Sequence, residues 1–523
     1  MFNLGYFTFP NSIRWKSTTE FIGKIFEFKP THPQLTQNLW ALNLHYFWIT
    51  VKSVTAGTFI GFLLALITSY IGASQLHRFK LPSYLTRIII SALRAVPIIV
   101  FVLFFKDSFE NYLASFVLYF WFTWLWMNRY LVDIIESSDF RFYYTDIKLG
   151  RSKFLSFYKN IFKSKKNKFL MNFLQAYESN IRWVTILGLV GITGLGFFFE
   201  NYKNYVQSLG ITLFFIALFV FLIELLLFLF NKVLLVWPKI NNQNVNSIYS
   251  FKYNWRKYLT RLILIIYLVI LVLSFLDLFG QKVYVVTLSS YFKSFLNFDF
   301  SVLNSKSVWL DYWTIIQQSY VAFSFSILIA ILYSSILAEK VTRGYISLIS
   351  KLLLSVIKII PVFFWYLIFN PLSLSLVAIN IALWISGFRA LTKQIAESIN
   401  ALSLSQIQLL KARGYNKFQL YIYFILPSIK HQLVASFFFE YEHLFRNVIT
   451  YGTFSGIGIY RLLQKYQQEG DYNKIFPLVF PAFIFIILLE ISLIIYRNKD
   501  KVIRLKQQLL TQIYSLKQQK STL

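Results

Sequence analysis

Two pairs of oppositely charged residues lie within strongly apolar stretches of this sequence. Glu178 and Arg182 are four residues apart, and Asn180 lies between them. Glu442 and Arg446 have the same spacing. On a helix, residues four apart share a face, so each Glu can neutralise its Arg. Charges in apolar helices usually mark a functional site or a pathway. Each pair therefore either locks packed helices together or places an arginine where it attracts an anionic solute.

The two pairs belong to an internal repeat in which equivalent residues are 264 positions apart. The register holds from Ser91, equivalent to Ser355, to Gly194, equivalent to Gly458. Isolated matches mean little in so apolar a composition, but one constant register that includes glycine, proline, glutamate and arginine indicates duplication. Matches between these limits, besides the two charged pairs, include Pro97 with Pro361, Gly150 with Gly414, Lys153 with Lys417, Phe154 with Phe418, Phe173 with Phe437, Tyr177 with Tyr441 and Gly188 with Gly452.

The composition predicts a membrane protein that crosses the bilayer many times. Of the 523 residues, 57% are hydrophobic and only 14% are charged, which is more apolar sequence than a soluble core needs. The net charge of +30 does not indicate a nucleic-acid partner, because the basic residues collect in segments between apolar spans, as the positive-inside rule expects. The chain has no cysteine and five scattered histidines, so we expect no thiol chemistry and no metal site.

Apolar stretches of about 20 residues predict an all-α integral membrane fold with about eleven transmembrane helices. We expect Pro97 and Pro361 to kink the spans that contain them. One period of the repeat holds six spans, an even number, so the two five-helix repeats are expected to be parallel, joined by a linking transmembrane helix. The expected spans lie near 46–73, 86–106, 110–131, 168–190, 208–236, 258–280, 312–337, 348–369, 372–391, 432–453 and 474–496.

The two long polar segments, 132–167 and 392–431, are basic and should therefore face the cytoplasm of a plasma membrane, with the N-terminus outside and the C-terminus inside. The resulting organisation is an extracytoplasmic segment 1–45, a first repeat 46–236, a cytoplasmic linker with the linking helix 237–280, an extracytoplasmic segment 281–311, a second repeat 312–497 and a basic cytoplasmic tail 498–523.

Two further patterns predict local structure. Residues 397–427 place apolar side chains at helical spacing and are interrupted at Gly414, which indicates two short amphipathic helices on the membrane face. A set of glycines follows each charged pair, and it permits either close helix packing or an outer gate. These glycines are Gly188, Gly191, Gly194, Gly452, Gly456 and Gly458.

The segment around Gly414 resembles the coupling motif of ABC importer permeases, which has the form EAA, three residues, Gly, nine residues, I-x-L-P. Gln408 occupies the first motif position and Pro427 the last. The pattern Glu178-x-Asn180-x-Arg182 with its following glycines resembles phosphonate-type permeases more narrowly. The sequence departs from these patterns at Tyr144 and Leu444, where the families have Glu and Asn, at Ser455, where they have Gly, and near position 163, where Leu-Pro is missing.

This resemblance implies a type I importer fold similar to methionine importers, with two ATPase subunits, a membrane-anchored substrate-binding lipoprotein and no cofactor of its own. ATP would be bound by the partner subunits, and the chain has no G-x-x-x-x-G-K-[ST] phosphate loop. Residues expected to dock the ATPases are Gln408, Lys411, Arg413, Gly414, Tyr415, Lys417, Phe418 and Pro427, with Gly150, Lys153 and Phe154 as counterparts.

A chain that fuses two such halves resembles the permeases of mycoplasma high-affinity transport systems, which are linked to phosphonates and to thiamine pyrophosphate. The resemblance thus implies import of a phosphorus-containing organic solute. Two alternatives stay open from the residues alone. One is a secondary transporter that uses Glu178 and Glu442 as proton sites. The other is an integral membrane lipid-modifying enzyme, although no paired carboxylates or histidine cluster lie at the membrane face.

Overall fold

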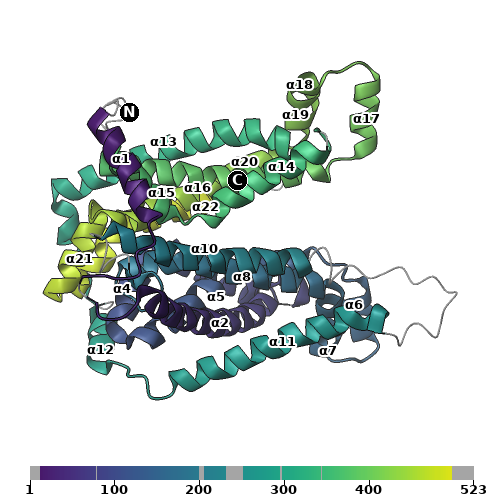
Figure 1. Ribbon diagram of the computed structural model, residues 1–523. Coiled ribbons are helices and arrows are strands. Elements are labelled where there is room, and N and C mark those ends of the chain that lie inside the picture. Colours follow the sequence, from purple (N-terminus) through teal and green to yellow (C-terminus); the bar gives the residue numbers. More distant parts are fainter. Residues whose placement is uncertain are drawn as a thin grey trace, which may run out of the picture. The chain divides into compact units, whose positions relative to one another are not determined.

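The computed structural model describes residues 12–33, 35–77, 79–198, 205–230, 251–294, 297–342 and 344–497. Within these ranges the regular structure is helical (Figure 1), and the extended pairing consists of two isolated bridges, His32 with Leu35 and Phe109 with Val283. The predicted all-α fold is therefore confirmed. Residues 231–250, which include most of the polar linker predicted to begin at 237, and the basic tail, 498–523, lie outside the described residues.

The first half of the chain contains the helices α1 (Ser12–Ile25), α2 (Leu39–Gly72), η2 (Ser74–Leu76), α3 (Leu81–Ala95), α4 (Ile98–Ser108), α5 (Asn111–Glu136), α6 (Arg141–Lys148), α7 (Lys153–Phe157), η3 (Tyr158–Phe162), α8 (Lys163–Leu189), α10 (Val206–Phe228), α11 (Phe251–Leu278), α12 (Val285–Ser294) and η6 (Phe300–Asn304). Of these, η3 is a π-helix.

The second half contains α13 (Lys306–Leu337), α14 (Gly344–Ile359), α15 (Val362–Phe369), α16 (Ser375–Ala401), α17 (Leu404–Ala412), α18 (Lys417–Leu420), η7 (Tyr421–Ile425), α19 (Leu426–Ser428), α20 (Lys430–Tyr451), η8 (Gly452–Phe454), α21 (Ile459–Glu469), η9 (Tyr472–Lys474) and α22 (Ile475–Arg497). Of these, η7 is a second π-helix, nearly equivalent to η3 in the repeat.

Among the described residues, six helices are long and apolar enough to cross a membrane, and the number rises to nine if each bent helix pair is one span. These nine coincide with predicted spans. The other two of the eleven predicted spans form α5 and α8, which are not among the nine. Composition explains why these two helices are not among the nine. The helix α5 is rich in Trp and Tyr, whose hydropathy is low although their rings are largely apolar. The helix α8 contains a charged pair and several lysines.

Both predicted proline kinks are present as helix breaks. Pro97 precedes α4 and Pro361 precedes α15, and each adopts an extended rather than helical ψ. Proline lacks a backbone N–H and clashes with the preceding turn, so a helix ends before it and a new one begins after it. The axes of α3 and α4 differ by 83°.

The chain forms two compact units. Unit 1 comprises residues 1–308, 358–379 and 449–478, and unit 2 comprises 309–357, 380–448 and 479–523. In unit 1, α2 and α5 approach closely because Gly57 and Gly61 lie at their crossing. A Cβ atom at Gly57 would lie 2.6 Å from the Cβ of Tyr119, and one at Gly61 would lie 2.4 Å from the carbonyl oxygen of Phe120. Small residues four apart permit such contact between membrane helices.

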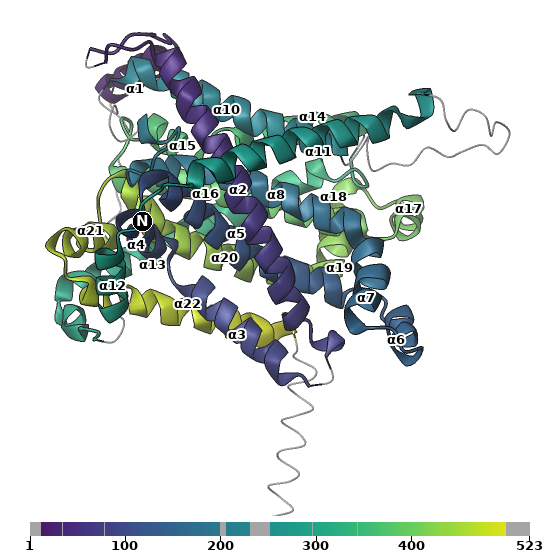
Figure 2. The same ribbon diagram turned by 90° about the horizontal axis from the view of Figure 1, so that it is seen from below.

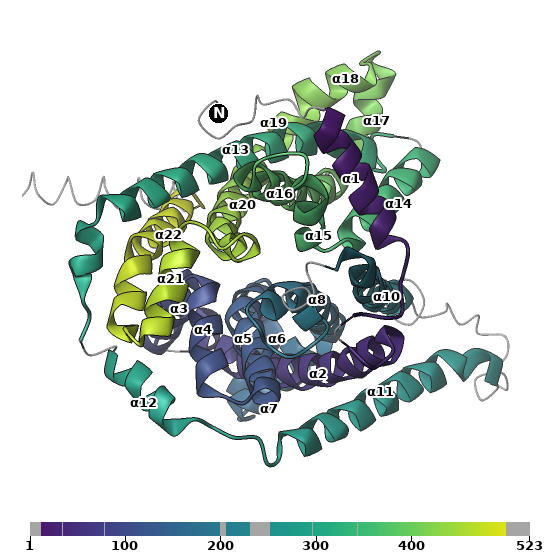
Figure 3. The same cartoon turned by 60° about the vertical axis from the view of Figure 1, so that its left-hand side comes forward.

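The helix α11, which corresponds to the predicted linking span, lies along the outside of unit 1 next to α2 (Figure 3). Most of its side chains between Trp255 and Leu278 are exposed, as expected for a helix that faces lipid. Its polar contacts with α2 are made near its C-terminal end. Ser274 Oγ donates a hydrogen bond to the backbone oxygen of Lys52 over 2.9 Å, and Asp277 forms an ion pair with the Lys52 ammonium. These contacts fix one end of α11 against α2.

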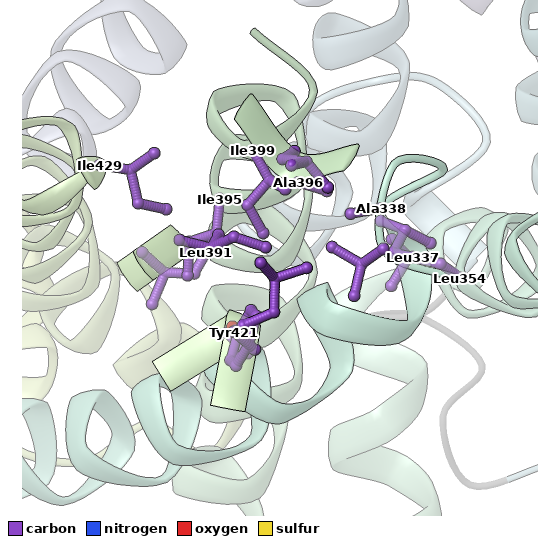
Figure 4. Close-up of a cluster of buried hydrophobic side chains, with 14 of the residues drawn as sticks. Leu337, Ala338, Leu354, Leu391, Ile395, Ala396, Ile399, Tyr421 and Ile429 are labelled. Carbon is purple, nitrogen blue, oxygen red and sulfur yellow. The ribbon is translucent and has the colours of Figure 1, made fainter. Parts of the chain in front are cut away.

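Each unit has a hydrophobic core beneath its predicted docking segment, and the two cores use equivalent positions. In unit 2 this core includes Leu391, Ile395, Ile399 and Tyr421 (Figure 4). Unit 1 has its own core of the same kind. Because equivalent positions are buried in both, the duplication seen in the sequence extends to the packing. The equivalent buried pairs are Ala73 with Leu337, Met127 with Leu391, Leu131 with Ile395, Ile135 with Ile399, Tyr143 with Ile407, Phe157 with Tyr421 and Ile161 with Ile425.

Candidate functional site

The predicted docking segment of unit 2 is a helix–turn–helix made of α17 and α18. Gly414 lies in the turn with φ +88°, and no atom lies within 4 Å of a Cβ built on it, so glycine is needed there for its backbone conformation. Asn416 then begins α18. Its Oδ1 accepts a hydrogen bond from the backbone N–H of Gln419 over 2.7 Å, and Gln419 Oε1 accepts one from the N–H of Asn416 over 3.1 Å. This reciprocal capping fixes the start of the second helix.

The turn presents aromatic and basic side chains to the surroundings. Phe418 is 70% exposed and Tyr415 is 43% exposed, although aromatic side chains of this size are usually buried. Ile407 and Leu420, on the opposite faces of α17 and α18, are buried in the core of unit 2. All eight residues predicted to dock an ATPase from this half are exposed, namely Gln408, Lys411, Arg413, Gly414, Tyr415, Lys417, Phe418 and Pro427. Figure 1 shows α17 and α18 projecting from one end of the long helices of unit 2.

Unit 1 repeats this segment in α6 and α7. Gly150 has φ +83°, and Ser152 Oγ caps α7 by accepting a hydrogen bond from the N–H of Leu155 over 3.3 Å. Phe154 is 66% exposed, and the other predicted counterpart, Lys153, is also exposed. The two docking segments therefore share a left-handed glycine, a polar helix cap and an exposed phenylalanine.

The two docking segments differ in what holds the turn together. In unit 1, the Asp146 carboxylate accepts hydrogen bonds from Arg151 Nη1 over 2.9 Å and from Asn160 Nδ2 over 2.8 Å. We call these three residues the Asp146 cluster. The hydrogen bond from Asn160, and then the hydrogen bond and charge of Arg151, hold the pKa of the Asp146 carboxyl below its ordinary value. The equivalent residues in unit 2 are Leu410, Tyr415 and Phe424, of which Leu410 and Phe424 pack against the unit 2 core. The polar set of unit 1 thus corresponds to two packed apolar residues and an exposed tyrosine in unit 2.

The first charged pair is part of a larger cluster in unit 1. Arg182 Nη1 lies 3.5 Å from Glu178 Oε1, and Lys358 Nζ lies closer, at 2.8 Å. Lys358 Nζ also lies 2.5 Å from Glu224 Oε1, on α10. We call Glu178, Arg182, Glu224 and Lys358 the Lys358 cluster. The charges of its two carboxylates and two cations sum to zero. The Glu178 side chain is only 2% exposed, whereas that of Arg182 is 30% exposed. The cluster joins α8, α10 and the end of α14.

Sequence reasoning missed Lys358, although one signal points to it. A basic residue stands three positions before each kinking proline, Arg94 before Pro97 and Lys358 before Pro361. Arg94 is also buried, and its guanidinium lies over the Trp126 ring at 5.9 Å from the ring centre. A cation at the same place in both halves is unusual within an apolar span.

The second charged pair is more deeply buried. Glu442 and Arg446 form an ion pair in α20, and the Arg446 side chain is only 1% exposed. The same helix of unit 2 also contains His443, whose Nδ1 lies 3.5 Å from Glu440 Oε1. Glu440 is itself 1% exposed and was not predicted as a site residue. The burial of Arg446 favours a role in holding α20 in place, because an arginine that meets solute must be reachable.

Asn180 holds three helices of unit 1 together. Its Nδ2 donates hydrogen bonds to Thr58 Oγ1 on α2 over 2.8 Å and to Thr123 Oγ1 on α5 over 2.7 Å. We call these residues the Asn180 cluster. The equivalent residues in unit 2 are Ala322, Gly387 and Leu444. There, a Cβ at Gly387 would lie 2.7 Å from Ser326 Oγ and 3.2 Å from Leu444 Cδ1, so serine and leucine together fill the space that a threonine would need. Here, a polar set in one half corresponds to an apolar set in the other.

The glycines after the charged pairs make two kinds of contribution. Gly188 lies where a Cβ would be 1.9 Å from the backbone of Gly196, so the chain crosses itself closely at the end of α8. Gly452 is likewise tight, with a Cβ 3.0 Å from the backbone oxygen of Ile457. The remaining members of the set form turns with positive φ, and these are Gly191, Gly194, Gly456 and Gly458.

The end of unit 1 opposite α6 and α7 is formed by α4, α12 and α21 (Figure 2). Asp107, at the end of α4, connects the other two. Its Oδ2 accepts hydrogen bonds from Tyr291 of α12 over 3.1 Å and from Gln467 of α21 over 2.6 Å. Burial, and then the Asp107 charge, raise the pKa of Tyr291. The segment 281–311, which is predicted to be extracytoplasmic, is thus joined to α21 at one end of the unit.

Comparison with known proteins relates these features to a family. Residues 322–505 match the family of binding-protein-dependent transport system inner membrane components, a range that includes α17, α18 and the charged pair of α20. The ABC transport system permease protein p69 of Mycoplasma pneumoniae is 24% identical over 476 residues, which cover 87% of this chain and 86% of p69. That of Mycoplasma genitalium is 23% identical over 452 residues, covering 84% and 83%. The chain is an ABC transporter permease subunit. No solved structure matches it.

An ABC permease subunit is a multi-pass membrane protein that works with ATPase partner subunits, and the architecture of this permease agrees with that role. The family match covers the second repeat, whereas the p69 relatives align with most of the chain. The first repeat lies outside the family match. Its fold is nevertheless of the same kind, because its docking segment and its core occupy equivalent positions.

Proposed function

We propose that this permease imports a phosphorus-containing organic solute, a phosphonate or a phosphorylated vitamin such as thiamine pyrophosphate. A membrane-anchored lipoprotein delivers the solute, and two copies of an ATPase subunit drive the import. The observation that carries the proposal is the pair of exposed helix–turn–helix segments. Each presents a phenylalanine, Phe154 or Phe418, next to a glycine turn, and two such segments in one chain provide one docking place for each of two ATPases.

Movement of a docked ATPase would reach the Lys358 cluster through one helix. The backbone remains helical from α7 through η3 into α8, with φ −57° and ψ −47° at Tyr158 and φ −63° and ψ −38° at Lys163. Glu178 therefore lies on the same rod as the docking residue Lys153, about 38 Å away at 1.5 Å per residue. In unit 2 the corresponding path bends at Ile429, where φ is −100° and ψ is 10°.

We place the docking segments in the cytoplasm, which puts the N-terminus outside and the C-terminus inside. The basic character of 132–167 and 392–431 supports this orientation. The opposite end of unit 1, where Asp107 joins α12 and α21, would then meet the lipoprotein.

The proposed solute class rests on the resemblance to phosphonate-type permeases and on the cations of the Lys358 cluster. Arg182 is partly exposed, and a guanidinium donates paired hydrogen bonds that match phosphate and phosphonate oxygens. Glu178 is already neutralised by cations in this cluster, which favours an anion-handling role for the cluster over a proton-carrier role for Glu178.

Two experiments test the proposal. Affinity-tagged permease should retain its ATPase on purification, and the double variant Tyr415→Ala/Phe418→Ala should retain less. The matched control is Leu264→Ala, at an equally exposed position on the outer face of α11. Retention that is the same in the docking variant and the control would contradict the docking assignment.

The solute is tested by uptake into cells or proteoliposomes with the lipoprotein present. We expect Arg182→Gln, at normal expression, to lower uptake of the phosphorylated solute, because Arg182 is the partly exposed arginine of the two charged pairs. If uptake and solute preference stay unchanged, Arg182 has no part in the pathway. Direct binding of candidate solutes to the lipoprotein then identifies the solute independently of the permease.

A further inference from the structure

The helix that leaves the first docking segment carries a strip of lysines. Lys159, Lys163 and Lys166 are spaced four and three residues apart, so they follow one face of a continuous helix. All three are exposed. Residues 152–168 contain three further lysines and no acidic residue. We call Lys159, Lys163 and Lys166 the lysine strip.

The lysine strip has no carboxylate partner within ion-pair distance among the described residues. The charge of Lys159 acts on Asp146 and helps to lower the pKa of that carboxyl. The Asp146 oxygens are, however, already occupied by Arg151 and Asn160. Three cations on one helical face without an ion pair repel one another, and a bound anion would relieve this repulsion.

Membrane topology alone does not account for the lysine strip. The equivalent positions of the second repeat hold Tyr423, Pro427 and Lys430. Only one of these is basic, although the two repeats are parallel in our prediction and their docking segments lie on the same side. The strip is therefore specific to the first repeat, and the positive-inside rule does not require it.

The position of the lysine strip along its helix identifies the kind of anion. The predicted membrane span begins near residue 168, just after the strip, which places the strip at the level of the lipid headgroups. Leu155 and Tyr158, immediately before the strip, are 61% and 52% exposed. Lysines next to exposed apolar and aromatic side chains are typical of helices that bind an anionic lipid surface.

We propose that the lysine strip binds the headgroups of anionic phospholipids. The lipid phosphates would neutralise Lys159, Lys163 and Lys166 where α7 and η3 lead into α8. Bound lipid would hold the first docking segment against the membrane surface, and the second docking segment would lack this contact. The proposal rests on the predicted position of the membrane span and not on the identity of the solute.

The test uses the full-length permease purified in a neutral detergent, with bound lipid counted by native mass spectrometry. The probes are palmitoyl-oleoyl phosphatidylglycerol and, as the neutral comparison, palmitoyl-oleoyl phosphatidylcholine. We expect phosphatidylglycerol to bind preferentially and to be released as sodium chloride is raised. Lysine near a membrane surface contributes about fivefold per residue, so Lys159→Gln/Lys163→Gln/Lys166→Gln should weaken phosphatidylglycerol binding roughly a hundredfold.

Two further variants make the result specific. Lys159→Arg/Lys163→Arg/Lys166→Arg keeps the charge and should keep the lipid, which separates loss of charge from misfolding. Lys411→Gln/Arg413→Gln/Lys417→Gln removes the same charge from the second docking segment and should leave phosphatidylglycerol binding unchanged. Equal binding of the two lipids, no effect of the Gln variant, or an equal loss in the second-segment variant would overturn the proposal. So would a Gln variant that keeps the lipid but loses its ATPase, because the lysines would then bind the partner protein.

Discussion

Exchanging the Asn180 cluster for its second-repeat equivalent tests whether the two repeats use interchangeable packing solutions. The first change is Asn180→Leu. It removes two interhelical hydrogen bonds, which contribute about 0.6 kcal/mol each between membrane helices. It also forces leucine branches against Thr123, where unit 2 leaves room only for a glycine, and such overpacking costs about 1–3 kcal/mol. We therefore expect the free energy of unfolding to fall by about 2–4 kcal/mol.

The second change removes the threonines as well. Thr58→Ala/Thr123→Gly/Asn180→Leu reproduces the unit 2 set of Ala322, Gly387 and Leu444, of which Ala322 and Leu444 are fully buried. The free energy of unfolding of the triple variant should lie within about 1 kcal/mol of the wild-type value, because the main remaining destabilisation is the lower helix propensity of glycine. Thr58→Ala/Thr123→Gly alone should be destabilised, since it leaves the buried Asn180 amide without its partners.

The assay is reversible unfolding by dodecyl sulfate in mixed micelles, followed by the fluorescence of the 13 tryptophans. The decisive quantity is the coupling between the two changes, obtained from the four corners of the mutant cycle. If the triple variant is no more stable than Asn180→Leu, the two sets are not equivalent packing solutions. The reasoning from the repeat would then be wrong at this site.

Three other perturbations have expected outcomes. Lys358→Met leaves the buried Glu178 with Arg182 at 3.5 Å and should lower the free energy of unfolding by about 2–4 kcal/mol. In the same dodecyl sulfate titration, Glu178→Gln/Lys358→Met should lose less free energy of unfolding than Lys358→Met. An equal loss in the two variants would show that the buried Glu178 charge does not cause the destabilisation. Gly414→Ala places a side chain at φ +88°, which should destabilise the turn by about 1 kcal/mol and reduce ATPase retention. The control Gly344→Ala, whose added Cβ meets no neighbouring atom, should not reduce it. Similar retention by the two variants would contradict the turn argument. Burial lowers the pKa of His32 below 6.5, so the unfolded chain takes up the proton first and stability should fall as pH drops below about 6.5. The melting temperature of the wild type should be lower at pH 5 than at pH 7.5. The difference should be smaller for His32→Phe, which keeps a ring against Tyr205. An equal difference in the two proteins would exclude His32 as the source.

Local patterns in the sequence predicted the features that depend on neighbouring residues. The breaks at Pro97 and Pro361 follow from the chemistry of proline, and the turn at Gly414 follows from the helical spacing on either side of it. The repeat predicted that Gly150 corresponds to Gly414, and both glycines adopt a positive φ between two short helices. These inferences need only the order of residues along one helix or turn.

Long-range contacts could not be predicted in the same way. Lys358 is 180 positions from Glu178 in the sequence, and no helical periodicity relates a side chain at the end of α14 to one on α8. The boundary between α16 and α17 was also misplaced. Residues 397–401 read as part of the first amphipathic helix, but they complete α16, which ends at Ala401. Ser403 has an extended ψ, so it separates α16 from α17, which begins at Leu404.

The Asp146 and Asn180 clusters also have a genetic consequence, because each occurs in one repeat only. In a permease built from two copies of one gene product, a substitution appears in both subunits at once, so a polar interaction that arises in one subunit arises in the other as well. Here both repeats are encoded in a single reading frame, and a mutation alters one of them. A set of three residues such as Asp146, Arg151 and Asn160 can then be present in one repeat and absent from the other. The duplicated halves are free to specialise, and a loss in either one is exposed to selection by itself.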